Sequence, residues 1–289
     1  GVAAWIWIAL FAPTQWAFGF STSLRMNFTI VLVTFLSYLF VFKDKRFSIG
    51  SIGVFIILFV LQAGISTLFQ DTLNPDVVFK EYIEHIKTAL LFVFITLIIK
   101  NKIQLITFVW AMVLAISCYA AMEATKFILS GGGHQIVGRA GVIIDRNDFA
   151  VAINMCIPLI FFLIYVTKHP MVKKFLWVIA LLNIVAVIGT YSRGGFIGLI
   201  IIAFAAWLKS NRKIIWLLLA TLCLPILYQK TPEEWRERQA TVKTAATEDE
   251  SFIGRLWAWK ISVLIAMEDP LTGGGYRAVT DPMLWRYHA

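Results

Sequence analysis

Residues 190–195 read Thr-Tyr-Ser-Arg-Gly-Gly and join two strongly apolar stretches. The chemistry that this segment suits is anion binding. Arg193 carries a permanent positive charge with several fixed donors, and Gly194 allows a sharp turn that leaves backbone amides exposed. An arginine beside such amides at a helix N-terminus suits phosphate, with Ser192 as a supporting hydroxyl. A plain turn with Arg193 anchored to lipid headgroups is the simpler interpretation, and both stay open.

A second candidate segment places two arginines just before another apolar stretch. Arg139 is followed by Asp-Arg-Asn-Asp at 145–148, which includes Arg146. Asn147 or Asp148 could cap a helix that begins there. An ion pair with Asp145 would satisfy one of the two arginines. Neither role explains two arginines in one short segment, so capping and anion binding are both predicted here.

Aromatic residues accompany a third arginine near the end of the chain. Arg255 precedes Trp257 by two residues, and Tyr276 follows a glycine triplet at 273–275. Aromatic rings beside arginine suit a sugar face together with phosphate. The same residue types also collect at the lipid interface, which is the competing interpretation.

The remaining polar residues indicate less. Glu81, Glu84, His85 and Lys87 could form a general-base cluster, although a solvated helix face explains them as well. The histidines and cysteines lack metal-ligand spacing, and the glycine triplets lack the Lys-Ser/Thr of a nucleotide loop. We therefore expect no metal and no cofactor.

The composition defines the setting of these residues. The 289 residues are 59% hydrophobic and 15% charged, with a mean hydropathy of +0.77. A soluble domain cannot bury that much apolar side chain. The net charge of +9 lies mostly in short clusters between apolar runs, which indicates membrane topology rather than nucleic-acid binding.

Nine apolar runs are visible, and in lipid they must be helices because isolated strands leave their backbone groups unpaired. They span 2–20, 28–42, 49–69, 88–99, 103–122, 148–167, 175–191, 195–208 and 214–229. The fourth becomes long enough only if it begins near Tyr82. The fold class predicted is all-α, a polytopic transmembrane bundle of about nine spans.

Every second connection is short and basic, which places these connections in the cytoplasm. The basic residues of these connections are Lys43, Lys45, Arg46, Lys100, Lys102, Lys168, Lys173, Lys174, Lys209, Arg212 and Lys213. The first residues are then cytoplasmic, and the outer face receives 21–27, 70–87, 123–147, 192–194 and everything after about 230. We predict a transmembrane domain at 1–229 and the start of a large outer loop at 230–289. Residues 233–250 are predicted to form an amphipathic extramembrane helix in it. The chain has no initial Met and no closing helix, so we expect a piece cut at both ends.

These features together resemble the O-antigen ligase superfamily, and most closely the O-glycosylation ligases associated with exosortase systems. The matching pieces are 145–150 leading into a helix with Asn154 and Pro158, then 191–195, then 254–259 with 270–276. They cover roughly 120–280, and Lys87 before a helix is the main match in the N-terminal half.

The resemblance implies a metal-independent glycosyltransferase of GT-C-like architecture in the bacterial inner membrane, with a large periplasmic loop. It would move a glycan from a polyprenyl-diphosphate carrier to a lipid, glycan or protein acceptor. Outward-facing arginines of the family hold the diphosphate, which implies Arg193, and also Arg139, Arg146 and Arg255. The supporting residues are Ser192, Gly194, Asp145, Asn147, Lys87, Trp257 and Tyr276. The family's acceptor-activating His, within a His-Asn/Ser motif, is expected beyond Ala289, and His288 is not assigned to that role.

Two other classes of function compete with a glycan ligase. An O-antigen polymerase of similar architecture differs only in its acceptor. A transporter or permease would show internal repeats and broken helices with polar residues at the membrane midplane. The polar residues here concentrate at the predicted outer ends of helices instead, which favours the ligase. A purely structural membrane scaffold is the least favoured.

Overall fold

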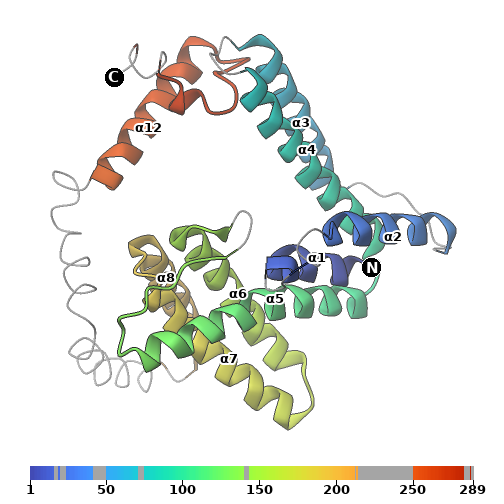
Figure 1. Cartoon of the computed structure of the whole chain (residues 1–289), viewed down its shortest axis with the longest axis vertical. Helices are drawn as coiled ribbons and strands as arrows, with labels where there is room; N and C mark the ends of the chain where they lie inside the picture. The colour runs from blue at the N-terminus through green and yellow to red at the C-terminus, as the bar shows by residue number, and fades with distance from the viewer. Residues whose placement is uncertain are drawn as a thin grey trace. The chain divides into compact units, whose positions relative to one another are not determined.

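The computed structural model describes residues 1–15, 19, 24–41, 50–70, 75–139, 143–211, 213, 250–282 and 287. Every regular element in these ranges is helical, which confirms the all-α class for this part of the chain (Figure 1). The apolar run 214–229 and residues 233–249 lie outside the described residues, as do Lys43, Lys45, Arg46 and Arg212.

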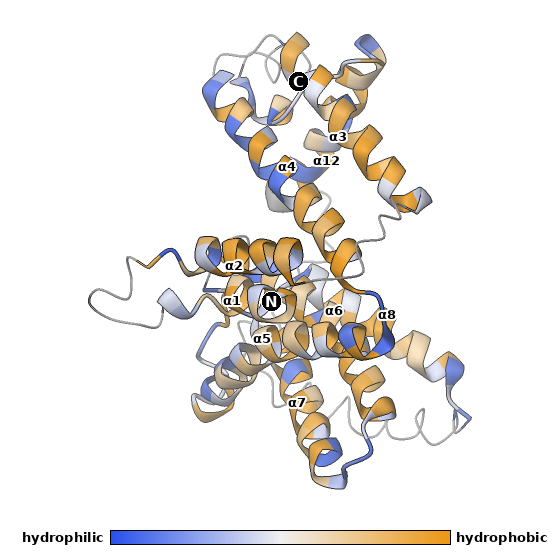
Figure 2. Cartoon of the chain, turned by 90° about the vertical axis from the view of Figure 1, so that its right-hand side faces the viewer, coloured by the Kyte–Doolittle hydropathy of each residue, from blue (hydrophilic) through white to orange (hydrophobic). Residues whose placement is uncertain are grey.

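Four of the described helices are long and apolar enough to cross a membrane. They are α3 (Ser51–Phe69), α5 (Lys102–Leu129), α6 (Arg146–Val166) and α7 (Pro170–Gly189). Apolar residues cover most of their length (Figure 2), and many large ones are exposed, as lipid-facing side chains are. The chain is therefore a multi-pass helical membrane protein, while the number of nine spans stays a prediction.

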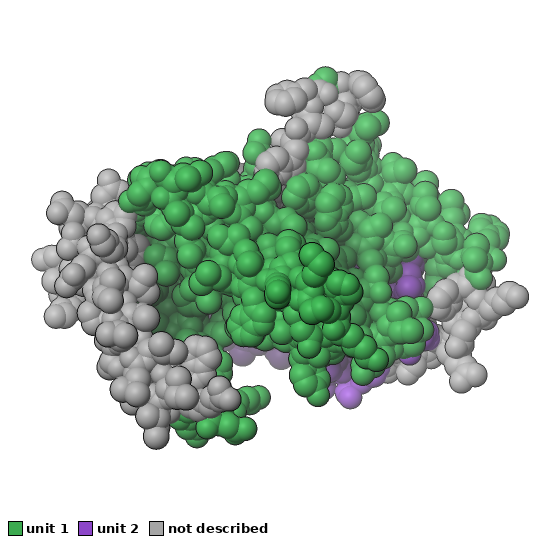
Figure 3. Space-filling view, turned by 90° about the horizontal axis from the view of Figure 1, so that it is seen from below, with its two compact units in different colours: residues 1–42, 101–240 green, residues 43–100, 241–289 purple. Residues whose placement is uncertain are grey.

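The chain divides into two compact units, coloured separately in Figure 3. The first unit comprises residues 1–42 and 101–240, and the second comprises 43–100 and 241–289. The predicted boundary between a membrane domain and an outer loop at 229/230 stays a prediction.

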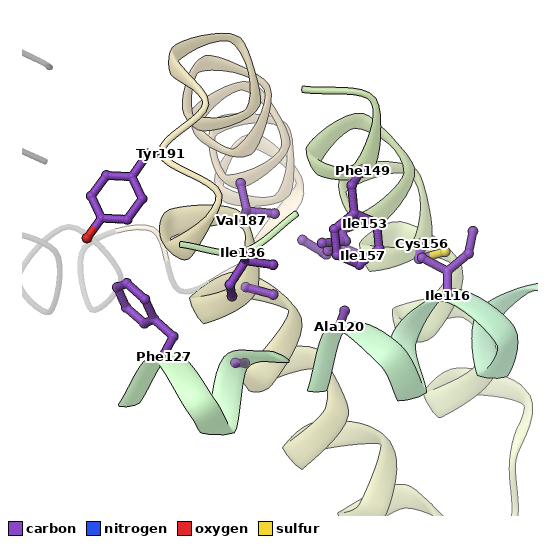
Figure 4. Close-up of a cluster of buried hydrophobic side chains, with 12 residues drawn as sticks. Ile116, Ala120, Phe127, Ile136, Phe149, Ile153, Cys156, Ile157, Val187 and Tyr191 are labelled. Carbon is purple, nitrogen blue, oxygen red and sulfur yellow. The ribbon is translucent and has the colours of Figure 1, made fainter. Parts of the chain in front are cut away.

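The first unit is a bundle in which α5, α6 and α7 all pack against one another. Helix α1 (Val2–Phe11) packs on α5 and on α2 (Met26–Phe40), and α8 (Arg193–Lys209) packs on α6 and α7. The core contains Phe149, Ile153 and Ile157, which recur every four residues along the inner face of α6 (Figure 4). This spacing places them on one stripe of the helix.

The connections of the first unit alternate between its two ends. Lys168 lies in the turn between α6 and α7, Lys174 lies near the start of α7, and Lys209 ends α8. The arginines that begin α6 and α8 lie at the other end of the same helices. In this unit these lysines and the arginines therefore lie at opposite ends of the helices, and the membrane side of each end stays a prediction.

The second unit contains α3, α4 (Pro75–Ile98), α12 (Glu250–Glu268) and the short 3₁₀ helix η4 (Ala278–Thr280). Helices α3 and α4 pack against each other. Their contact is close at Gly64, where an added Cβ would lie 3.0 Å from the Tyr82 ring carbon Cζ. A glycine there lets the two helices approach.

The first apolar run was predicted to continue to residue 20, but α1 ends at Phe11. Ala12 adopts a left-handed conformation with φ of 46°, and Pro13 begins a 3₁₀ turn. Proline disfavours helical backbone in the residue before it and lacks an N–H donor. At about 1.5 Å per residue, the ten residues of α1 are too short to span a bilayer core.

Parts of two segments assigned to outer loops, residues 75–87 and 123–129, are helical. Helix α4 begins at Pro75, before the predicted Tyr82, because proline fits the first helical position and Asp76 favours the first turn. Helix α5 continues to Leu129 and ends where Gly131 takes a φ of 63°. In addition, α12 forms within the predicted outer loop.

Candidate functional site

Two Arg-bearing connections meet at one end of the first unit. The α5–α6 loop starts at Ser130, and the α7–α8 turn is Thr190–Ser192. The backbone N–H of Ile136 donates to the carbonyl of Gly189 at 2.8 Å. The Tyr191 hydroxyl donates to the carbonyl of Gly132 at 2.5 Å. These bonds join segments more than fifty residues apart into one surface.

Tyr191 itself is strained to make this contact. Its φ is 54°, although it is not a glycine, and its side chain is buried against the edge of the Phe127 ring at 6.2 Å between centroids. Left-handed backbone in an aromatic residue is unfavourable and persists only where its surroundings hold it. Figure 4 shows Tyr191 and Phe127 beside each other at one side of the core.

The N-termini of α6 and α8 are joined directly. Ser192 caps α8 by accepting from the backbone N–H of Gly195 at 3.1 Å. The same hydroxyl donates to Oδ1 of Asn147 at 2.7 Å. Since α6 begins at Arg146 and α8 at Arg193, this single bond brings two predicted ligands to adjacent helix starts.

The two helices continue side by side in the same direction. Contacts pair Asn147 with Ser192, then Ala150 with Gly195, then Asn154 with Gly198. An added Cβ on Gly195 would lie 2.5 Å from Cβ of Ala150. The Asn154 amide donates to the Gly195 carbonyl at 2.8 Å. A small residue at this crossing allows the close approach that the Ser192–Asn147 bond requires.

Asp145 caps α6, a position for which the sequence favoured Asn147 or Asp148. Its carboxylate accepts from the backbone N–H of Asn147 at 2.7 Å. This backbone hydrogen bond is the main reason why the pKa of Asp145 is lowered. The carboxylate is therefore ionised at neutral pH, and it stands beside Arg146 in the sequence.

Arg139 lies near the start of α6. It lines a small pocket together with Tyr119 of α5 and Phe149 in the first turn of α6. The pocket has a volume of about 20 Å³, which is room for about one water molecule. A diphosphate would therefore bind outside this pocket, on the surface that the helix starts and the loop form.

Three of the four predicted arginines thus share one end of the first unit. The Arg146 and Arg193 side chains are half-buried and that of Arg139 is exposed. The guanidinium groups of these arginines can bind a phosphate or diphosphate oxygen by several charge-assisted hydrogen bonds. Gly194 is exposed, with open space where a Cβ would stand. Within the described ranges, no group of three metal-ligating side chains occurs.

The Asp145 carboxylate that caps α6 should make stability depend on pH in a defined way. The pKa of Asp145 is lower in the folded chain than its ordinary value of about 3.9. Its stabilising contribution is therefore complete above the ordinary value and is lost as pH falls through the lower folded value. We expect Asp145→Ala to cost about 1 kcal/mol at neutral pH, and Asp145→Asn to keep the cap without this pH dependence.

Thermal unfolding in detergent at pH 7 and pH 3 measures this difference. Asp145→Asn should lose less stability on acidification than the wild type does. Equal losses would show that the Asp145 carboxylate does not carry the pH dependence.

The second unit contains the other predicted residues. The Arg277 guanidinium donates to Oε1 of Glu81 at 2.7 Å, and the Tyr276 ring lies 5.9 Å from the His85 ring between centroids. Burial, followed by neighbouring Tyr82 and Glu81, raises the pKa of Tyr276. Its hydroxyl therefore stays protonated at neutral pH and can donate a hydrogen bond.

Arg255 and Trp257 lie on α12, and Lys87 lies on α4. Arg255 is exposed, and Trp257 is half-buried with Nζ of Lys260 4.3 Å above its ring. Lys87 bonds Oε1 of Glu84 at 2.7 Å on an exposed face. An exposed pair three residues apart contributes little to stability. Their role in donor binding stays a prediction.

The sequence reasoning missed one polar group of the first unit. Glu123, assigned to an outer loop, is 4% exposed near the end of α5. It binds Lys126 at 2.6 Å and His134 at 2.7 Å. Lys126 three residues after Glu123 was a visible helical signal, whereas nothing in the spacing of His134 indicated this partner.

Comparison with known protein families gives two matches, one to the N-terminal part of the chain and one to the C-terminal part. A family model described as O-antigen ligase matches residues 178–288. A second model, described as a family of unknown function (DUF5935), matches residues 1–169. No curated protein and no solved structure matches the chain. Arg193 and Arg255 fall in the first match, and Arg139 and Arg146 fall in the second.

Proposed function

Because this chain belongs to the O-antigen ligase superfamily, with an N-terminal part in the DUF5935 family, we propose that it is a periplasmic-face glycan ligase of the bacterial inner membrane. It transfers an oligosaccharide or polysaccharide from a polyprenyl-diphosphate carrier to an acceptor hydroxyl. The family supports a membrane ligase or polymerase in general. The proposal also includes the identity of the donor and acceptor, the membrane face, independence of metal and the likeness to exosortase-associated ligases.

The observation that carries the proposal is the pair of adjacent helix starts, each with an arginine, joined by the Ser192–Asn147 hydrogen bond. In the reaction, the acceptor hydroxyl oxygen forms a bond to the anomeric carbon as the bond from that carbon to the diphosphate oxygen breaks, and the hydroxyl proton passes to a base or to water. Negative charge then develops on the departing diphosphate. Preorganised donors aimed at developing charge lower the barrier most.

Each part of the site has a role in this step. Arg146 and Arg193 stabilise the departing diphosphate by paired, charge-assisted hydrogen bonds. Arg139, at the neighbouring pocket, supplies a third cation. A prenyl tail explains why such a site lies at the end of membrane helices, because the tail can remain in lipid while the diphosphate reaches the arginines.

Reconstitution of the protein in vesicles with a polyprenyl-diphosphate glycan tests the proposal. The acceptors are lipid A core oligosaccharide, free glycan and a Ser/Thr-rich peptide, and the assay follows release of the carrier and the glycosylated product. We expect transfer by the wild type and almost none by the Arg146→Ala/Arg193→Ala double variant. Lys174→Ala, which removes a cation near the opposite end of α7, is the matched control and should retain transfer.

The outcomes separate the competing functions. Unchanged turnover in the double variant would contradict the diphosphate site. Accumulation of glycan inside vesicles without a covalent product would indicate a transporter. Lengthening of the free glycan alone would indicate a polymerase.

A further inference from the structure

The Glu123 carboxylate is buried and bound by two side chains. It lies near the end of α5 with 4% of its surface exposed. Lys126 donates to its Oε1 at 2.6 Å, and Nε2 of His134 lies 2.7 Å from its Oε2. Lys126 is three residues away on the same helix, so it constrains no other element. The bond to His134 is different because it reaches into the α5–α6 loop.

In the bond between His134 and Glu123, the histidine ring is the hydrogen-bond donor. An ionised carboxylate only accepts hydrogen bonds, so Nε2 of His134 carries the proton. The backbone N–H of His134 also donates to Oγ of Ser130 at 2.9 Å. His134 is thus attached to the end of α5 through both its backbone and its ring.

The loop beyond His134 is attached on both sides. The Ile136 N–H donates to the Gly189 carbonyl beside the α7–α8 turn, and the Tyr119 hydroxyl donates to the Val137 carbonyl at 2.9 Å. Two residues later comes Arg139, at the pocket that includes Phe149 of α6. The loop is therefore held at His134, Ile136 and Val137, the last of these two residues before Arg139.

A buried carboxylate is a costly way to attach a loop. A buried ion pair commonly contributes little net stability, whereas removal of one partner leaves an uncompensated charge. What such a pair supplies is a defined geometry. Among the described residues, Glu123 of α5 is the charged group bound to His134, and the same carboxylate also binds Lys126.

We propose that Glu123 and His134 are positioning residues for the lipid-linked diphosphate, holding the loop so that Arg139 is presented beside the start of α6. The proposal rests on the function proposed above, because Arg139 is useful there only if the ligand is anionic. Neither residue is assigned a proton transfer in the reaction.

Two substitutions of His134 distinguish positioning from other roles. His134→Leu removes the donor to Glu123. His134→Gln restores an N–H donor at similar reach. We expect His134→Leu to raise KM for the donor about tenfold, with kcat changed much less, since a small displacement of a binding group weakens binding. His134→Gln should recover most of this loss, and KM for the acceptor should not change.

A readout independent of turnover is hydrogen exchange of residues 131–139 together with binding of unglycosylated polyprenyl diphosphate to the full chain. His134→Leu should speed exchange at Ile136 and weaken binding, and His134→Gln should restore both. His169→Leu, an exposed histidine at the start of α7, is the matched control and should change neither.

Three results would overturn the proposal, and they differ in meaning. Faster exchange in His134→Leu with unchanged binding would show that the pair attaches the loop without serving the ligand. Loss of activity in His134→Gln as severe as in His134→Leu would indicate a proton-transfer role instead of positioning. If the wild type does not bind polyprenyl diphosphate, the diphosphate site itself is contradicted. The proposed role of the Glu123–His134 pair in positioning Arg139 is then contradicted with it.

Discussion

Replacement of Arg193 by alanine should lower kcat/KM for the polyprenyl-diphosphate donor by about 10²–10³-fold, the effect of removing one preorganised donor at developing charge. Arg193 begins α8 beside the Ser192–Asn147 bond, so its position relative to both helix starts is defined. Arg193→Lys should recover only part of the loss, because lysine keeps the charge but not the paired donors.

Steady-state transfer in vesicles, with the donor concentration varied, measures this effect. Lys174→Ala is the control, since it removes a cation from the connection at the other end of α7. Activity of Arg193→Ala within a few-fold of the wild type would mean that Arg193 is an interfacial anchor and not a ligand. Equal activity of Arg193→Lys and wild type would reduce its role to charge alone.

Substitution of Gly195 by alanine should destabilise the first unit by about 1–3 kcal/mol, the usual cost of overpacking. The added Cβ would lie 2.5 Å from Cβ of Ala150, an atom that cannot move without its helix. Helices α6 and α8 must therefore separate, and the Ser192–Asn147 bond would lengthen or break. Transfer should fall with stability because both arginines are carried by these helix starts.

The neighbouring glycine provides the control for this prediction. Gly194 has open space where a Cβ would stand, and alanine is the better helix former. Gly194→Ala should therefore leave the melting temperature in detergent unchanged or slightly raised, while Gly195→Ala lowers it. Equal melting temperatures for the two variants would show that the close crossing at Ala150 does not stabilise the unit.

The sequence allowed the common location of Arg139, Arg146 and Arg193 to be predicted for a physical reason. Basic residues such as Lys168 and Lys209 mark alternate connections, and alternation alone places the remaining connections at the opposite end. Helix class was equally accessible, because long apolar runs in lipid have few other structures. The membrane face to which that end belongs stays a prediction.

Other features depend on contacts that no local pattern contains. The Ser192–Asn147 bond joins residues forty-five positions apart, and the Glu123–His134 bond depends on the path of a glycine-containing loop. The end of α1 could have been predicted from Pro13, and the start of α4 from Pro75 and Asp76, had hydropathy not been weighed above these local signals.

The parallel course of α6 and α8 has an electrostatic consequence. Antiparallel neighbours in a bundle cancel each other's macrodipole, whereas these two bring like poles together, each equivalent to about half an elementary charge. Arg146 and Arg193 add positive charge at these poles, and the carboxylates of Asp145 and Asp148 at the start of α6 offset it. A bound dianion would remove the mutual repulsion of the poles. An anion that binds the folded chain but not the unfolded chain stabilises the folded chain. The proposed donor would therefore act as a structural counter-ion as well as a substrate.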